Sequence, residues 1–235
     1  MRELDDLRER GYSIIGVMPA PMLAQMNRWL HNGVVYLDAH VPQTARNRGA
    51  CVVPMKDADG VECFCAPTAD AILAPHLIDT ALTLTDIAAA YLGRDPPVMY
   101  SANVFWTRPG TAPLRNDIQA FHVDSDDTKF LAMFVYLTDV LTDEDGPQDL
   151  HGPDGVVRTI FGHAGTIFLA DTSRLHRGRK PTSHLRGIAW VRWGVSDHPP
   201  AGVWDKIEPV SEQECWVWYP DDPRLQESIK LLVRE

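Results

Sequence analysis

The sequence predicts a mainly β protein, an antiparallel sandwich or barrel flanked by helices. After residue 97, short segments rich in β-branched and aromatic residues follow one another closely. Turns rich in Gly, Pro and Asp separate these segments. Helical periodicity is found before residue 97 and again after residue 221. The six expected strands are residues 98–107, 118–124, 129–140, 156–160, 165–171 and 186–196.

The first part of the chain is expected to be largely helical. Apolar residues recur at helical spacing within residues 4–7 and again within residues 22–30. The segment between them, GYSIIGV (11–17), contains β-branched residues and predicts a short strand. Pro19 and Pro21 are expected to open the second helix.

An irregular segment rich in Pro, Gly and Asn follows, from about residue 40 to residue 70. It contains one expected hairpin, because the Asp59-Gly60 turn signal lies between CVVPM (51–55) and VECFC (61–65). A third helix is expected over residues 74–91.

The chain ends in DDPRLQESIKLLVRE (221–235), where aspartates precede Pro223 and apolar residues recur at helical spacing. This pattern predicts a small amphipathic helix. No segment has the composition of a linker, so we expect a single domain over residues 1–235. Its expected parts are a helical region (1–97), a β core (98–200) and the closing helix (221–235).

Composition excludes several classes of partner. The 22 Lys and Arg residues stand against 32 Asp and Glu, which gives a net charge of −10. A negative surface repels phosphate, so we expect neither nucleic acid nor a membrane as a partner. The densest apolar stretch, FLAMFVYL (130–137), is far shorter than the roughly 20 residues of a membrane helix. The four cysteines indicate no disulfide framework, and the charged start lacks a signal peptide's apolar core, so we expect a cytoplasmic protein.

The sharpest local feature is His122-Val123-Asp124 in the expected strand 118–124. Side chains two positions apart on a strand share a face, so His122 and Asp124 are expected to project together. An imidazole nitrogen and a carboxylate oxygen on one face form a two-point metal site. The alternative is a surface His–Asp pair on a solvated strand.

A second histidine and an arginine extend this pattern. His176 lies just beyond the expected strand 165–171, and Arg186 follows ten residues later. Two histidines and one carboxylate form the facial triad of non-haem Fe(II) oxygenases. The triad leaves positions open for a bidentate 2-oxo acid and for O2. An arginine beside it can hold the far carboxylate of that acid through two hydrogen bonds.

In their order along the chain, these pieces resemble the phytanoyl-CoA dioxygenase-like family of Fe(II)/2-oxoglutarate-dependent oxygenases. The resemblance spans most of residues 4–196. The matching segments are LRERGYSIIGVMPAPMLAQMNRWL (7–30), FHVD (121–124), FVYLTDVLTDEDGP (134–147), GTIFLADTSRLHRG (165–178) and Arg186 with the apolar strand after it.

The resemblance implies a double-stranded β-helix core (jelly-roll, cupin-like) over residues 98–200, with iron at one mouth. It implies that His122, Asp124 and His176 bind Fe(II) and that Arg186 pairs with the C5 carboxylate of 2-oxoglutarate. Related halogenases have a small residue where this chain has Asp124, so the resemblance favours hydroxylation or another oxidation over halogenation.

The chain also departs from the family. Many relatives place Ser or Thr two residues after the arginine, where this chain has Ile188, so a second C5 contact must come from elsewhere. Asn103 and Gln119 are the candidates for the C1 carboxylate. Arg46 and Arg48 lie in the irregular segment, which we expect either to cover the substrate or to form a variable surface loop.

The sequence therefore favours an Fe(II)- and 2-oxoglutarate-dependent dioxygenase that consumes O2 and releases succinate and CO2. The expected partner is a small-molecule substrate, a metabolite or natural-product intermediate such as an amino acid, to be hydroxylated. Two alternatives remain: a cupin-like metal dioxygenase or isomerase that does not use 2-oxoglutarate, and a non-enzymatic jelly-roll binding module. The sequence does not indicate the oligomeric state.

Overall fold

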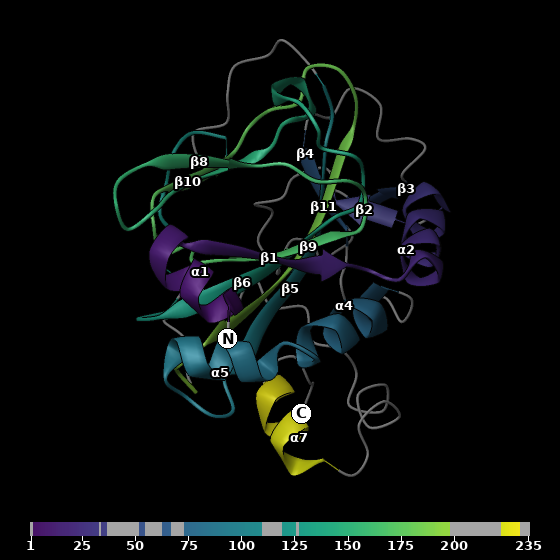
Figure 1. Ribbon diagram of the computed structural model, residues 1–235. Coiled ribbons are helices and arrows are strands. Elements are labelled where there is room, and N and C mark those ends of the chain that lie inside the picture. The colour runs from purple at the N-terminus through teal and green to yellow at the C-terminus, as the bar shows by residue number, and fades with distance from the viewer. Residues whose placement is uncertain are drawn as a thin grey trace.

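Two antiparallel sheets and a layer of helices form the part of the chain that the computed structural model describes (Figure 1). The described residues are 2–32, 34–36, 52–54, 63–66, 73–109, 119–125, 127–197 and 222–230. No helix within them is long and apolar enough to cross a bilayer.

The large sheet has eight strands in the order β1-β9-β6-β11-β5-β4-β2-β3, all antiparallel. The small sheet has three, in the order β10-β7-β8. The strands of the large sheet are β1 (Tyr12–Val17), β2 (Val34–Tyr36), β3 (Val52–Pro54), β4 (Cys63–Ala66), β5 (Val98–Thr107), β6 (Phe130–Tyr136), β9 (Thr166–Ala170) and β11 (Arg186–Gly194). Those of the small sheet are β7 (Gln148–His151), β8 (Val157–Ile160) and β10 (His176–Gly178).

The helices are α1 (Arg2–Arg10), α2 (Ala20–Asn32), α4 (Leu73–Leu82), α5 (Thr85–Leu92) and α7 (Pro223–Ile229), with a 3-10 turn at Asp143–Asp145. Figure 1 shows α1, α4, α5 and α7 on the side of the large sheet away from β8 and β10. The Asp222 carboxylate caps α7 by accepting from the backbone N–H groups of Arg224 and Leu225, as the aspartates before Pro223 predicted.

Side chains that point alternately to the two faces of the central strands form two apolar cores. On β6 (FLAMFVY) every residue is buried. Leu131 and Met133 pack with the helices, whereas Ala132 and Phe134 pack between the two sheets. The space between the sheets is therefore lined from both sides.

Three expectations about local structure are wrong. The expected hairpin between 51–55 and 61–65 does not form, because β2 lies between β3 and β4 and pairs with both. The expected helix 74–91 is two helices, since the hydroxyls of Thr80 and Thr83 bond back to carbonyls of the preceding turn, at His76 and Thr80.

The third correction concerns the expected strand 118–124. Among its described residues only His122 makes a β-bridge, and that bridge is isolated. Its partner is His176 on the edge strand β10, so the segment pairs with the small sheet at one residue only and does not form a further strand of it. The other five expected strands of the β core appear, with shifts of a few residues at their ends.

The packing of α1 generates a stability prediction. Leu7 is fully buried in the core between helices and sheet. We expect Leu7→Ala to lower the free energy of unfolding by about 2–5 kcal/mol, because it leaves a cavity in that core. The control Arg8→Ala, at an exposed position of the same helix, should change it by less than about 0.5 kcal/mol. Urea denaturation measures both, and equal effects would contradict the placement of α1.

Candidate metal centre

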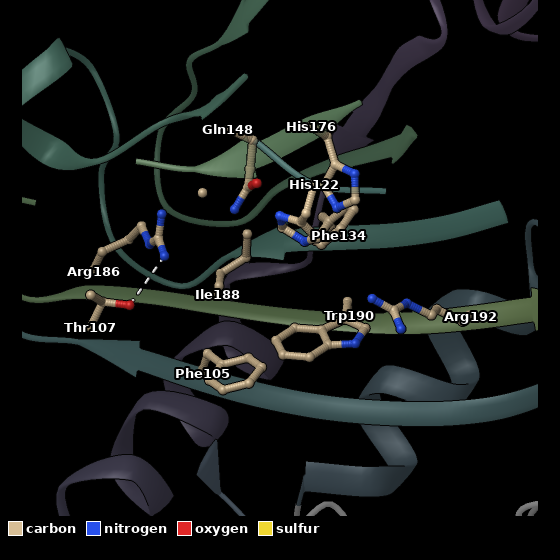
Figure 2. A pocket seen from close by; sticks show the side chains of 11 residues that line it. Phe105, Thr107, His122, Phe134, Gln148, His176, Arg186, Ile188, Trp190 and Arg192 are labelled. Atoms are coloured by element: carbon tan, nitrogen blue, oxygen red, sulfur yellow. Dashed lines mark hydrogen bonds between the residues drawn. The ribbon is translucent and has the colours of Figure 1, made fainter. Parts of the chain in front are cut away.

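A pocket opens between the two sheets and receives side chains from both (Figure 2). The central strand β11 contributes four residues at alternate positions, which share one face of the sheet. The small sheet contributes residues of β7 and β10. The lining residues are Phe105, Thr107, His122, Phe134, Gln148, His176, Gly178, Arg186, Ile188, Trp190 and Arg192.

The structure brings His122, Asp124 and His176 together at this pocket. Each offers one ligand atom, and the three atoms lie within 4.8 Å of one another. Asp124 Oδ1 lies 3.8 Å from His122 Nε2, and Asp124 Oδ2 lies 3.6 Å from His176 Nε2. It is the only such cluster of histidine, cysteine and acidic residues among the described residues.

Backbone hydrogen bonds set this geometry. His122 and His176 exchange two bonds, from each N–H to the other's carbonyl, at 2.9 and 2.8 Å. The Asp124 N–H donates to the Thr172 carbonyl at 3.0 Å, which fixes the aspartate against the turn that precedes His176. Segments far apart in sequence are thereby held in register.

The imidazoles are oriented by their second nitrogens. Nδ1 of His122 lies 2.9 Å from the Ala120 carbonyl, and Nδ1 of His176 lies 2.9 Å from the Arg174 carbonyl. A carbonyl oxygen only accepts, so each Nδ1 carries a proton, and in this tautomer Nε2 is the nitrogen that can bind a metal. This arrangement is typical of metal-binding histidines.

The electrostatics keep the groups in the states that bind a cation. Burial lowers the pKa of His176 to about 4, and the nearby charge of Asp124 offsets burial only in part. Burial alone would raise the pKa of Asp124, but several opposing interactions, of which the charge of Arg192 is the largest, together hold that pKa below its usual value. At neutral pH the site therefore presents a neutral His176 and an ionised Asp124.

Arg186 lies at the other end of the pocket (Figure 2), and it is 3% exposed. One guanidinium nitrogen donates to the carbonyls of Gly146 and Arg179 at 2.5 and 3.0 Å, and the other donates to Thr107 Oγ1 at 3.1 Å. Thr107 faces Arg186 directly across the β5–β11 ladder. The arginine is thus fixed in place with part of its fork turned toward the pocket.

Gly178 keeps this end of the pocket open. A Cβ added there would lie 2.9 Å from Gln148 Nε2 and 3.1 and 3.2 Å from the two terminal nitrogens of Arg186. Those distances are shorter than ordinary contacts of a methyl group, so a side chain at position 178 would require the Gln148 amide and the Arg186 guanidinium to shift by a few tenths of an ångström. The space beside Arg186 therefore depends on a residue without Cβ.

The other sequence candidates do not gather here. Asn103 lies on β5 opposite Trp190, and its side chain is outside the described part. Gln119 is buried, but it is not among the described pocket-lining residues. Arg46 and Arg48 lie outside the described residues.

Sequence reasoning missed six residues of the pocket, and the most informative is Arg192, whose Nη2 lies 2.6 Å from Asp124 Oδ2. Its signal was present: on a strand, position 192 shares a face with position 186, so a charged residue in an otherwise apolar segment pointed to the same pocket. The others missed are Phe105, Thr107, Phe134, Gln148 and Gly178.

Comparison with known proteins identifies the fold. No family model and no curated protein matches the sequence. The chain is similar to the epimerase SnoN in complex with Fe3+, alpha ketoglutarate and nogalamycin RO, at 16% identity over 86% of each chain, with a TM-score of 0.59. It is similar to HygX from Streptomyces hygroscopicus with nickel and 2-oxoglutarate bound, at 12% identity over 83% of this chain and 87% of that one, with a TM-score of 0.55.

A prolyl-4-hydroxylase from Pseudomonas putida is also similar, at 15% identity over 83% of this chain and 98% of that one, with a TM-score of 0.52. At such identities the likeness concerns the fold alone. It confirms the predicted fold class, a mainly β protein with flanking helices and a jelly-roll core.

The burial of His176 generates a prediction about protonation. In the metal-free protein we expect its imidazole to titrate near pH 4, well below the ordinary value of 6.5, because burial disfavours the charged ring. The unfolded chain takes up this proton at higher pH, so the free energy of unfolding should fall as pH drops from 6.5 toward 4. NMR titration, assigned with His176→Gln, measures this, and a midpoint near 6.5 would contradict it.

Proposed function

We propose that this protein is an Fe(II)- and 2-oxoglutarate-dependent dioxygenase that hydroxylates a small molecule, a metabolite or a natural-product intermediate such as an amino acid. The observation that carries the proposal is that His122, Asp124 and His176 converge within 4.8 Å, and that both histidines line the same pocket as a buried arginine. The fold supports the proposal, because SnoN and HygX, which share it, hold a metal ion and the keto acid.

The donor set fits a ferrous ion. Two neutral imidazoles and one carboxylate are the ligands of the facial triad, and they leave positions open on the far side of the metal. When bound, iron and the keto acid supply the activation of O2 and the oxidising chemistry that no side chain in this pocket has. The residues of this chain hold, orient and shield those reactants.

The pocket beyond the triad fits a dicarboxylate. In this proposal Arg186 pairs with the C5 carboxylate of 2-oxoglutarate, and Gly178 leaves the room for it. The Thr107 hydroxyl, 3.1 Å from the guanidinium, supplies the second contact that Ile188 cannot give. The buried guanidinium distinguishes this function from a cupin-like reaction that does not use the keto acid.

Aromatic side chains form the wall beside the triad. Phe105 and Trp190 stack with their ring centroids 4.3 Å apart and their planes 12° from parallel, and Phe134 lies against the same indole. In this proposal the wall excludes water from the reacting carbon and packs against the substrate. A stacked wall is rigid, so it can favour one carbon–hydrogen bond over its neighbours.

The first test is the anaerobic addition of Fe(II) and 2-oxoglutarate. We expect a weak visible charge-transfer band and, in air with a screened panel of small molecules, succinate release that depends on 2-oxoglutarate. Asp124→Ala should lose both, because it removes one of three ligands. A metal enzyme that does not use 2-oxoglutarate would turn over without succinate, and a binding module would give no band. Either outcome would overturn the proposal.

The second test concerns the keto-acid end of the pocket. Gly178→Ala should raise the KM for 2-oxoglutarate about tenfold, because the new methyl group displaces the Arg186 guanidinium. Arg186→Met should raise it by about 10- to 100-fold, the loss of one charge-assisted contact of about 1.5–3 kcal/mol. Gly16→Ala is the control, since no atom lies within 4 Å of a Cβ at that position and its φ is not positive. An unchanged KM in both pocket variants, with unchanged thermal unfolding, would contradict the assignment.

A further inference from the structure

Arg192 contacts the metal-site carboxylate directly. Its Nη2 lies 2.6 Å from Asp124 Oδ2, which is the distance of a strong charge-assisted hydrogen bond. The two side chains are only 16% and 13% exposed. Figure 2 shows Arg186 and Arg192 at opposite ends of the pocket, with the two imidazoles between them. Arg192 is therefore remote from the proposed C5 contact.

The neighbours of Arg192 in the large sheet leave space for its side chain to extend across the pocket toward Asp124. It lies on β11, the central strand, and its neighbours in register are Ser101 on β5 and Ala132 on β6. Both have small side chains, which leave room for a long side chain to cross toward the opposite wall. Asp124 lies on that wall, and its backbone N–H is held by the Thr172 carbonyl. Both partners of the ion pair are thus fixed by the backbone.

Stability alone is a weak explanation for this pair. Removing two charges from water is costly, and apolar residues of similar volume are often as stable as a buried ion pair or more stable. The four lining positions of β11 include Ile188 and Trp190, so the strand accommodates apolar side chains on this face. Because stability does not explain the guanidinium of Arg192, we look for its role in the function of the site.

The position of the carboxylate suggests that role. Asp124 Oδ1 faces His122 Nε2 at 3.8 Å and Oδ2 faces His176 Nε2 at 3.6 Å, so both oxygens are directed toward the imidazole pair. An unrestrained carboxylate so placed can offer both oxygens to one cation. Arg192 donates a hydrogen bond to Oδ2, which leaves Oδ1 available to a cation.

We propose that Arg192 is a positioning residue that makes Asp124 a one-oxygen ligand. This inference rests on the proposed function. A facial triad needs three open positions, two for the keto acid and one for O2. A carboxylate that offered two oxygens would take one of them. By holding Oδ2, Arg192 preserves the position that the keto acid needs.

Calorimetric titration with Ni(II), and then of the Ni(II)-loaded protein with 2-oxoglutarate, tests this role at pH 8. In Arg192→Met we expect the Ni(II) affinity to stay within about threefold of the wild type, because all three ligands remain. The affinity for 2-oxoglutarate should fall about tenfold, because the released oxygen competes for its place. Arg192→Lys, which keeps a charged donor, should restore most of the loss. Near-UV circular dichroism checks the fold of each variant.

A double-mutant cycle separates positioning from direct attraction. In an Asp124→Asn background, at saturating Ni(II), the neutral amide is a poor chelator, so Arg192→Met should no longer weaken 2-oxoglutarate binding. If the tenfold loss persists there, Arg192 attracts the keto acid itself and the positioning role is wrong.

The cycle also separates this inference from the proposed function. If the wild-type protein binds no Ni(II), or binds it without 2-oxoglutarate, the proposed function fails and the inference fails with it. If the wild type binds both and Arg192→Met binds 2-oxoglutarate equally well, the inference alone is wrong.

Discussion

The site depends on the pair of backbone hydrogen bonds that His122 and His176 exchange. These bonds join an irregular segment to the edge of the small sheet, so the two imidazoles become neighbours with ring centroids 4.3 Å apart. The turn before His176 is held in its own right. The Asp171 carboxylate accepts from the Tyr91 hydroxyl at 2.7 Å and from Arg174 Nε at 3.0 Å, which ties the turn to α5. The helical layer therefore helps to position His176, a proposed metal ligand, on the other side of the large sheet.

The central strand β11 links stability to chemistry. Its residues Ala189, Val191 and Trp193 are buried against the helices, and the residues between them face the pocket. Because the strand is paired on both sides, a shift of one residue in its register would move Arg186 and Arg192 out of the pocket and bring core residues into it. The same apolar packing that stabilises the fold thus sets the distance between the two guanidinium groups.

The sequence correctly predicted those strands that a local pattern of residues determines. The apolar runs at 98–107 and 186–196 became β5 and β11, because alternation and turn residues act within a few positions. Strand order is set by contacts far along the chain, so β2 between β3 and β4 was not foreseen. Asp124 could be grouped with the two histidines from residue type and chain order. Strand alternation could place Arg192 on the pocket face with Arg186, but its pairing with Asp124 could not be foreseen, because that ion pair joins two elements whose approach only the fold determines.

The charges in the pocket are arranged before any cation arrives. Asp124 is ionised and matched by Arg192, while burial keeps His176 neutral at ordinary pH. A cation that enters need not displace a proton from either ligand, so little reorganisation opposes binding. The buried guanidinium of Arg186 adds positive charge inside a chain of net charge −10. The surface and the pocket therefore act over different ranges. The surface repels polyanions at a distance, and in the proposed function the buried guanidinium holds a small dicarboxylate that has reached the pocket.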